Sequence, residues 1–187
     1  KGYMKGDSLV NSPYEFTDRN FYPLLDQQAV LKAILFPESV EPKKRFNLRE
    51  DDYKFMYKYM SQMPTESTYP KYNPTEFYPT YCKFLMYGSG KNDVPNPNMR
   101  IFNKVGDAYG FLLDNAYIVD FEKGVEFMLT TVLLCNNDEI FNDDKYDYDT
   151  IGFPFMKNLG QLLYEYESKR PKKYKPNFDN LKFSYQN

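Results

Sequence analysis

Apolar residues recur at helical spacing in three segments of the chain. The first, residues 24–36, carries a continuous apolar stripe and stops at a proline. The second, residues 48–60, follows Asn47 as a candidate N-cap and has acidic residues in its first turn. The third, residues 152–168, alternates apolar and charged positions near the end of the chain. This spacing of three and four residues predicts three amphipathic helices.

Between the second and third helical segments, the pattern changes to runs typical of β-strands. Three strands are predicted over residues 99–105, 115–121 and 124–135, with a tight hairpin at Gly124 between the last two. The third run is almost wholly apolar, which predicts a strand covered on both faces. Lys104 falls where the first strand should end. The fold class predicted is an α/β (α+β) sandwich with an antiparallel sheet covered by helices.

The remaining segments are rich in turn-forming and polar residues. Residues 1–23 are expected to be irregular, residues 69–81 form a loop rich in proline and tyrosine, and residues 136–150 form an acidic loop. We predict one domain over residues 1–168 and a charged C-terminal tail over residues 169–187.

Composition excludes several classes of function. The 187 residues fit one domain, and 24 basic against 26 acidic residues give a net charge of −2, which argues against nucleic-acid binding. No apolar run is long enough to span a membrane. The chain has no histidine and only two cysteines, Cys82 and Cys135, both in apolar surroundings that favour buried, inert thiols. Neither a metal site nor an organic cofactor is predicted, so any catalysis must come from Ser, Lys, Tyr, Asp or Glu.

The stretch "KVGDAYGFLLDNAYIVDF", which begins at Lys104, resembles a known motif. Lys104, Val105, Gly106 and Asp107 fall on the Lys-Thr/Ser-Gly-Ser/Thr of penicillin-recognising serine enzymes. The sequence of residues 1–168, which also contains "YMSQMPTES", "CKFLMYG" and "FNDDKYDYDTIG", resembles class A β-lactamases. It resembles especially the β-lactamase-related serine hydrolases common in Bacteroidetes.

The resemblance implies the C-terminal portion of the serine β-lactamase/transpeptidase-like fold, in an exported protein of the periplasm or envelope. It implies acyl transfer on an ester or amide, either a β-lactam or a cell-envelope peptide, in which a serine attacks while a nearby lysine accepts its proton. Lys104 would anchor a substrate anion, and the backbone from Val105 to Asp107 would line the cleft, with Gly106 allowing close approach.

The chain departs from the family pattern at several places. Val105 replaces a hydroxyl residue, and Asp107 places a carboxylate where the family has Ser or Thr. Both changes argue against efficient penicillin hydrolysis. No serine is followed by lysine at the third position, and no Ser-x-Asn motif is present. This chain is therefore expected to hold no catalytic residue and to be inert alone, with the nucleophile supplied by an N-terminal portion of the same protein.

A non-catalytic function is an alternative hypothesis. A non-catalytic envelope module with the same fold would bind glycan or peptide through its tyrosine-rich surface, for which residues 69–81 are the candidate loop. In that reading, Lys104 is a solvated lysine at the end of a strand.

Overall fold

The computed structural model describes residues 1–185, which form an α+β fold with four α-helices and two three-stranded sheets. The main sheet has the order β3-β4-β5, and both of its strand pairs are antiparallel. Its strands are β3 (Met99–Ala108), β4 (Phe111–Asp120) and β5 (Val125–Leu134). This meander confirms the predicted antiparallel sheet.

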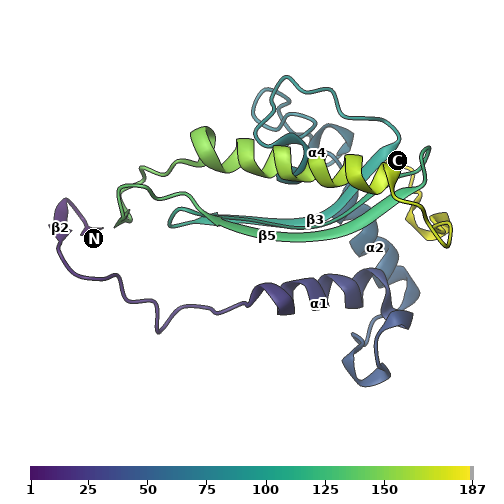
Figure 1. The fold of residues 1–187 in the computed structure, drawn as a ribbon, viewed down its shortest axis with the longest axis horizontal. Helices are drawn as coiled ribbons and strands as arrows, with labels where there is room; N and C mark the ends of the chain where they lie inside the picture. Colours follow the sequence, from purple (N-terminus) through teal and green to yellow (C-terminus); the bar gives the residue numbers. More distant parts are fainter. Residues whose placement is uncertain (186–187) are drawn as a thin grey trace.

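Helices cover both faces of the main sheet (Figure 1). Helix α4 (Phe153–Lys169) lies over one face, beside the short helix α3 (Phe84–Tyr87). Helices α1 (Leu24–Leu35) and α2 (Glu50–Ser61) lie on the opposite side. The α4-side core contains Phe84, Leu85, Met86, Met99, Ile101, Leu112, Ala116, Ile118, Cys135 and Met156. The α1-side core contains Leu31, Leu35, Tyr57, Phe102, Tyr117, Val119, Phe178 and Leu181.

The three predicted helices are confirmed, with small shifts at their ends. Helix α2 begins at Glu50, and its N-cap is Arg49 instead of Asn47. The backbone N–H of Arg49 donates to the Asp52 carboxylate over 2.8 Å, and this bond closes the first turn.

The first hairpin of the sheet is longer than its sequence pattern indicated. Strands β3 and β4 continue to Ala108 and from Phe111, so that Tyr109 and Gly110 alone make the turn. Gly106 is therefore inside a strand, paired with Leu113. The expected break at residues 106–114 is wrong, because antiparallel pairing carries the ladder through a glycine and an aspartate of low strand propensity.

A second sheet was not predicted. Strands β1 (Gly2–Lys5) and β2 (Ser8–Val10) form a hairpin, and β1 also pairs in parallel with β6 (Ile140–Phe141). Residues within 1–23, expected to be irregular, thus contribute two strands. The paired residues of β1 and β6 are 138 positions apart in the sequence, and local pattern does not reveal such a pairing.

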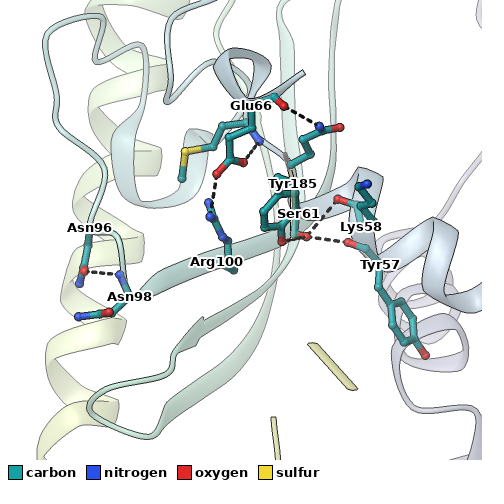
Figure 2. A network of polar contacts seen from close by, with 10 residues as sticks. Tyr57, Lys58, Ser61, Glu66, Asn96, Asn98, Arg100 and Tyr185 are labelled. Carbon is teal, nitrogen blue, oxygen red and sulfur yellow. Dashed lines mark hydrogen bonds and ion pairs between the residues drawn. The ribbon is translucent and has the colours of Figure 1, made fainter. Parts of the chain in front are cut away.

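The charged tail is anchored to the body of the protein. Phe178, Leu181 and Tyr185 are all buried. The Tyr185 hydroxyl lies 2.7 Å from the Ser61 hydroxyl, and the Arg100 guanidinium stacks 4.5 Å from the Tyr185 ring centre while pairing with Glu66 over 2.7 Å (Figure 2). These contacts fix the tail against α2 and the beginning of β3.

We expect Gly110→Ala to destabilise the protein more than Gly124→Ala. Both glycines have positive φ, at +82° and +62°, but a Cβ on Gly110 would lie 2.8 Å from the Cβ of Asn136, whereas a Cβ on Gly124 meets no atom within 4 Å. The positive φ alone costs about 1 kcal/mol. The clash should bring the loss at Gly110 to about 3 kcal/mol. Urea unfolding of both variants tests this order, and equal losses would show that the turn relaxes freely.

Candidate functional site

Lys104 lies near the end of β3, on the face that α1 and α2 cover. Side chains alternate between the two faces of a strand, so Lys104 and Gly106 share the face of Phe102, which belongs to the α1-side core. The Lys104 side chain is exposed, and its ammonium donates to the Val105 carbonyl oxygen over 2.7 Å. The ammonium group of Lys104 therefore lies at the protein surface, two residues along the strand from the buried Phe102.

A groove of about 510 Å³ opens beside this cation, between α1, α2 and the sheet. Most of its wall is apolar, and Lys104 is the charged residue among those that line it within the described chain. The lining comprises Tyr22, Gln27, Val30, Leu31, Ile34, Met56, Met60, Lys104, Val105, Gly106, Leu113 and Asn115. The structure therefore brings together three of the predicted site residues, Lys104, Val105 and Gly106.

One corner of the groove is polar and held by hydrogen bonds. The Asn115 amide donates to the Gln27 carbonyl oxygen over 2.8 Å and accepts from the Thr130 hydroxyl over 2.8 Å. The Gln27 side chain donates to the Tyr22 carbonyl oxygen over 2.8 Å. These bonds join the start of α1 to β4 and β5, so the groove has a fixed width at this end.

The outer edge of β3 presents outward-pointing backbone groups next to the groove, and the Val105 carbonyl oxygen among them already accepts from the Lys104 ammonium. The Ile101 carbonyl oxygen points outward, because it accepts from the Lys83 ammonium over 2.9 Å instead of from β4. Backbone groups alternate direction along an antiparallel strand, so those of Val105 and Asp107 point outward too. An extended ligand chain could pair with the Val105 N–H and with the backbone groups of Asp107.

Asp107 does not line the groove. It borders a separate hollow of about 560 Å³ together with Tyr109, Tyr146 and Tyr148 on the other side of the sheet. The alternation of side chains along β3 explains this position. The carboxylate that seemed, from sequence, to oppose an anionic ligand is therefore directed away from Lys104.

A buried ionic network, which sequence reasoning missed, connects the end of α2 to β3 next to the groove. The Lys83 ammonium donates to the carbonyl oxygens of Met60 and Ile101 over 2.8 and 2.9 Å, and to the Asn103 side-chain oxygen over 2.7 Å. The Asn103 amide in turn donates to the Asp114 carboxylate over 2.9 Å, which also accepts from the Leu85 N–H over 3.0 Å.

Burial shifts the pKa of both charged groups in this network. Loss of water lowers the pKa of Lys83 to about 8, although the nearby Asp114 charge opposes the shift. The same cause raises the pKa of Asp114 to about 6, against the hydrogen bonds from Leu85 and Asn103. Since every donor of Lys83 is occupied, we assign this network a structural role.

Ser61 and Lys83 border the same small cavity but do not form a catalytic pair. The Ser61 hydroxyl lies 2.7 Å from both the Tyr57 carbonyl oxygen and the Tyr185 hydroxyl, while the Lys83 ammonium bonds to the three oxygens given above. The cavity measures about 10 Å³, which is room for about one water molecule. A substrate does not fit there.

The tyrosine-rich loop forms a shallower hollow of about 270 Å³ on the neighbouring surface. Tyr72, Phe77 and Tyr81 line it together with Tyr59 of α2. Tyr69 of the same loop is 95% exposed. This is an aromatic surface of the kind that stacks on sugars or peptides.

The two cysteines differ in burial. Cys135 is buried and Cys82 is half-buried, and burial raises the pKa of both thiols. Of the helices in residues 1–185, none combines the length and apolar character needed to cross a bilayer.

Comparisons with protein-family models, with curated proteins and with solved structures find no match to this chain.

We expect Lys83→Met to lower the free energy of unfolding by about 3 kcal/mol, because it leaves three buried oxygens without a donor and Asp114 without a nearby cation. The matched variant Lys104→Met should change it by less than about 0.5 kcal/mol, since that side chain is exposed. Urea unfolding distinguishes the two, and equal midpoints would remove the structural role of Lys83.

The stabilising effect of Lys83 should grow at alkaline pH. Its pKa is about 8 when folded against 10.5 when unfolded, so between these values the unfolded chain binds more protons and stability rises with pH. The difference in unfolding free energy between the protein and Lys83→Met should widen by about 1–2 kcal/mol from pH 8 to pH 10. A difference that stays constant or narrows would contradict the burial of a charged amine.

Proposed function

We propose that this chain forms one wall of the acyl-transfer site of a serine hydrolase related to class A β-lactamases, whose nucleophile comes from a further segment of the same protein. The observation that carries the proposal is the position of Lys104, which is the one charged residue among the described residues that line an apolar groove and which lies at an edge strand of the main sheet. An exported, envelope-associated location goes with this proposal.

A vacancy next to the groove supports a missing segment. Phe111, Val132 and Leu134 are 41%, 46% and 50% exposed and share the α1-side face of the sheet with Gly106 and its partner Leu113. Helix α1 does not extend over this end of the sheet (Figure 1). Apolar sheet surface of this kind is normally covered, so a further segment has a place to pack within reach of Lys104.

The chemistry assigned to the chain is binding and orientation. The Lys104 ammonium attracts a carboxylate or other anion of the substrate, and the outward Val105 N–H and backbone groups of Asp107 align its amide or ester portion. The serine of the further segment attacks the carbonyl carbon, its proton passes to a neighbouring lysine, and the leaving group departs. Water then releases the acyl group from the serine. The absent hydroxyl at Val105 removes one donor to the anion, which favours substrates other than penicillins.

A second candidate is a non-catalytic module that binds glycan or peptide. The exposed Tyr69 and the aromatic hollow at Tyr72 and Tyr81 favour it. It requires no serine nucleophile, which separates it from the hydrolase in the experiment below.

Serine-directed labelling tests the hydrolase. A fluorophosphonate and a fluorescent penicillin should label a form of the protein extended before Lys1, and neither should label residues 1–187 alone. In the extended form, Lys104→Ala should lower the labelling rate of the anionic penicillin probe about tenfold or more, because a charged contact to its carboxylate is lost.

Lys91→Ala removes another exposed lysine and serves as the matched control, with no change expected. Unchanged penicillin labelling in Lys104→Ala would remove the role given to that residue. An extended form in which no serine reacts, while glycan or peptide still binds, would favour the second candidate.

A further inference from the structure

Apolar side chains line the groove beside Lys104 from two helices. Val30 and Ile34 of α1 line it together with Met56 and Met60 of α2, and all four side chains are only half-buried. A spacing of four residues places the members of each pair on the same face of their helix. The two helices therefore give the groove a hydrocarbon wall whose apolar surface is not fully covered by the protein itself.

The floor of the groove is open at Gly106. Its partner in the sheet is Leu113, and a Cβ placed on Gly106 would meet one atom within 4 Å, the Leu113 Cδ2 at 3.8 Å. Gly106 lies two residues beyond Lys104 on the same face of β3, so the open floor adjoins the cation. A ligand can therefore lie flat on the sheet next to the ammonium.

The polar groups beside Lys104 are already engaged with each other. Asn115 is directly opposite Lys104 in the sheet, and its side chain is paired with the Gln27 carbonyl oxygen and the Thr130 hydroxyl. The Lys104 ammonium has three N–H donors, and the Val105 carbonyl oxygen accepts from one of them. The ammonium is therefore the group at this end of the groove that can bind the charged head of a ligand.

One cation beside a hydrocarbon wall defines the chemistry of the ligand. A carboxylate complements the ammonium, and an alkyl chain complements the wall, whereas a second charge on the ligand would lose its water without gaining a partner. A peptide between the helices would leave its N–H and C=O groups unpaired, because the polar side chains there bond to each other. Methionine side chains adapt to alkyl chains of different lengths. The volume of about 510 Å³ is within the range of small-molecule sites.

We propose that this groove binds a single-chain amphiphile with one carboxylate, of the medium-chain fatty acid class. Its alkyl chain would lie between α1 and α2, and its carboxylate would bind the Lys104 ammonium. The inference names a ligand class for the groove of the proposed function, and it rests on that function only for the anion-binding role of Lys104. Binding itself needs no serine nucleophile, so residues 1–187 alone are sufficient to test it.

Chain length tests the hydrocarbon wall. Octanoate, decanoate and dodecanoate, each below its micellar concentration, are titrated into residues 1–187 and followed by calorimetry. Each step of two carbons should tighten binding about four- to fifteen-fold, because full burial of one methylene strengthens binding about fourfold. Affinities that do not depend on chain length would overturn the proposal.

Exchange of the head group tests the contact with Lys104. Lys104→Ala should weaken decanoate binding about tenfold and should leave the weaker binding of 1-decanol unchanged, because only the carboxylate gains from the ammonium. Lys32→Ala removes an exposed lysine of α1 that is not among the residues lining the groove, and it is the matched control with no change expected. Equal losses for decanoate and 1-decanol, or no loss for either, would show that the carboxylate does not bind Lys104.

Filling the floor tests the position of the alkyl chain. Gly106→Val should weaken decanoate binding at least about tenfold, because the new side chain occupies the space next to Lys104. The urea midpoint should stay within about 0.2 M or rise, since the backbone of Gly106 is that of an ordinary strand residue and valine favours strands. Undiminished binding in a folded Gly106→Val protein would place the ligand elsewhere.

Methyl NMR locates the ligand on the protein. Decanoate should shift the methyl signals of Met56 and Met60, which line the groove, and should leave that of Met156 in place, because Met156 is fully buried in the α4-side core. Unchanged Met56 and Met60 signals at saturating decanoate would overturn the site.

The outcomes separate this inference from the hydrolase. Decanoate binding by residues 1–187, combined with failure of the serine-labelling experiment, would support the ligand class and reject the hydrolase. Serine labelling without decanoate binding would do the reverse. A doubled mass of residues 1–187 in sedimentation, with no decanoate binding, would show that a second copy covers the groove and would overturn the inference.

Discussion

The buried ammonium of Lys83 is the interaction on which the arrangement of the site depends. It joins the end of α2, through Met60, to the outer edge of β3, through Ile101 and Asn103. A charge without water is tolerated only when all its donors are satisfied, so these elements must keep their relative positions. The groove beside Lys104 is bordered by α2 and β3, and its shape is a consequence of this constraint.

Much of the fold follows from local pattern, and the exceptions have physical reasons. The helices at α1, α2 and α4 and the antiparallel meander are predictable, because the spacing of apolar residues directly encodes their buried faces. The extension of β3 and β4 to a turn at Tyr109 and Gly110, and the pairing of β1 with β6, depend on contacts with other strands. Such contacts override the weak intrinsic preference of residues like Gly106 and Asp107.

Of the candidate site, the sequence predicted only the consecutive residues that begin at Lys104. Lys104 and Gly106 lie on the face of the sheet that borders the groove, whereas the side chains of Val105 and Asp107 lie on the other face, because adjacent residues of a strand face opposite ways. Val105 still borders the groove, because it lies between Lys104 and Gly106 in the strand. The Lys83–Asn103–Asp114 network and the bond from Asn115 to Gln27 link residues far apart in the chain. The local sequence does not reveal these hydrogen bonds. Lysines are rarely buried, and the residues next to Lys83 do not distinguish it from an exposed lysine.

The apolar sequence of β5 indicated a strand covered on both faces, yet the strand is half-buried at an edge of the sheet. The two edges of the sheet therefore differ in kind. At β3, Lys83 bonds to the Ile101 carbonyl oxygen, the Asn103 side chain bonds to the Cys82 carbonyl oxygen, and Lys104 bonds to the Val105 carbonyl oxygen. At β5, no strand pairs with the outer edge within residues 1–185. Charged side chains thus occupy two of the outward carbonyl oxygens at the β3 edge and hinder pairing with another strand, a protection that the apolar β5 strand lacks.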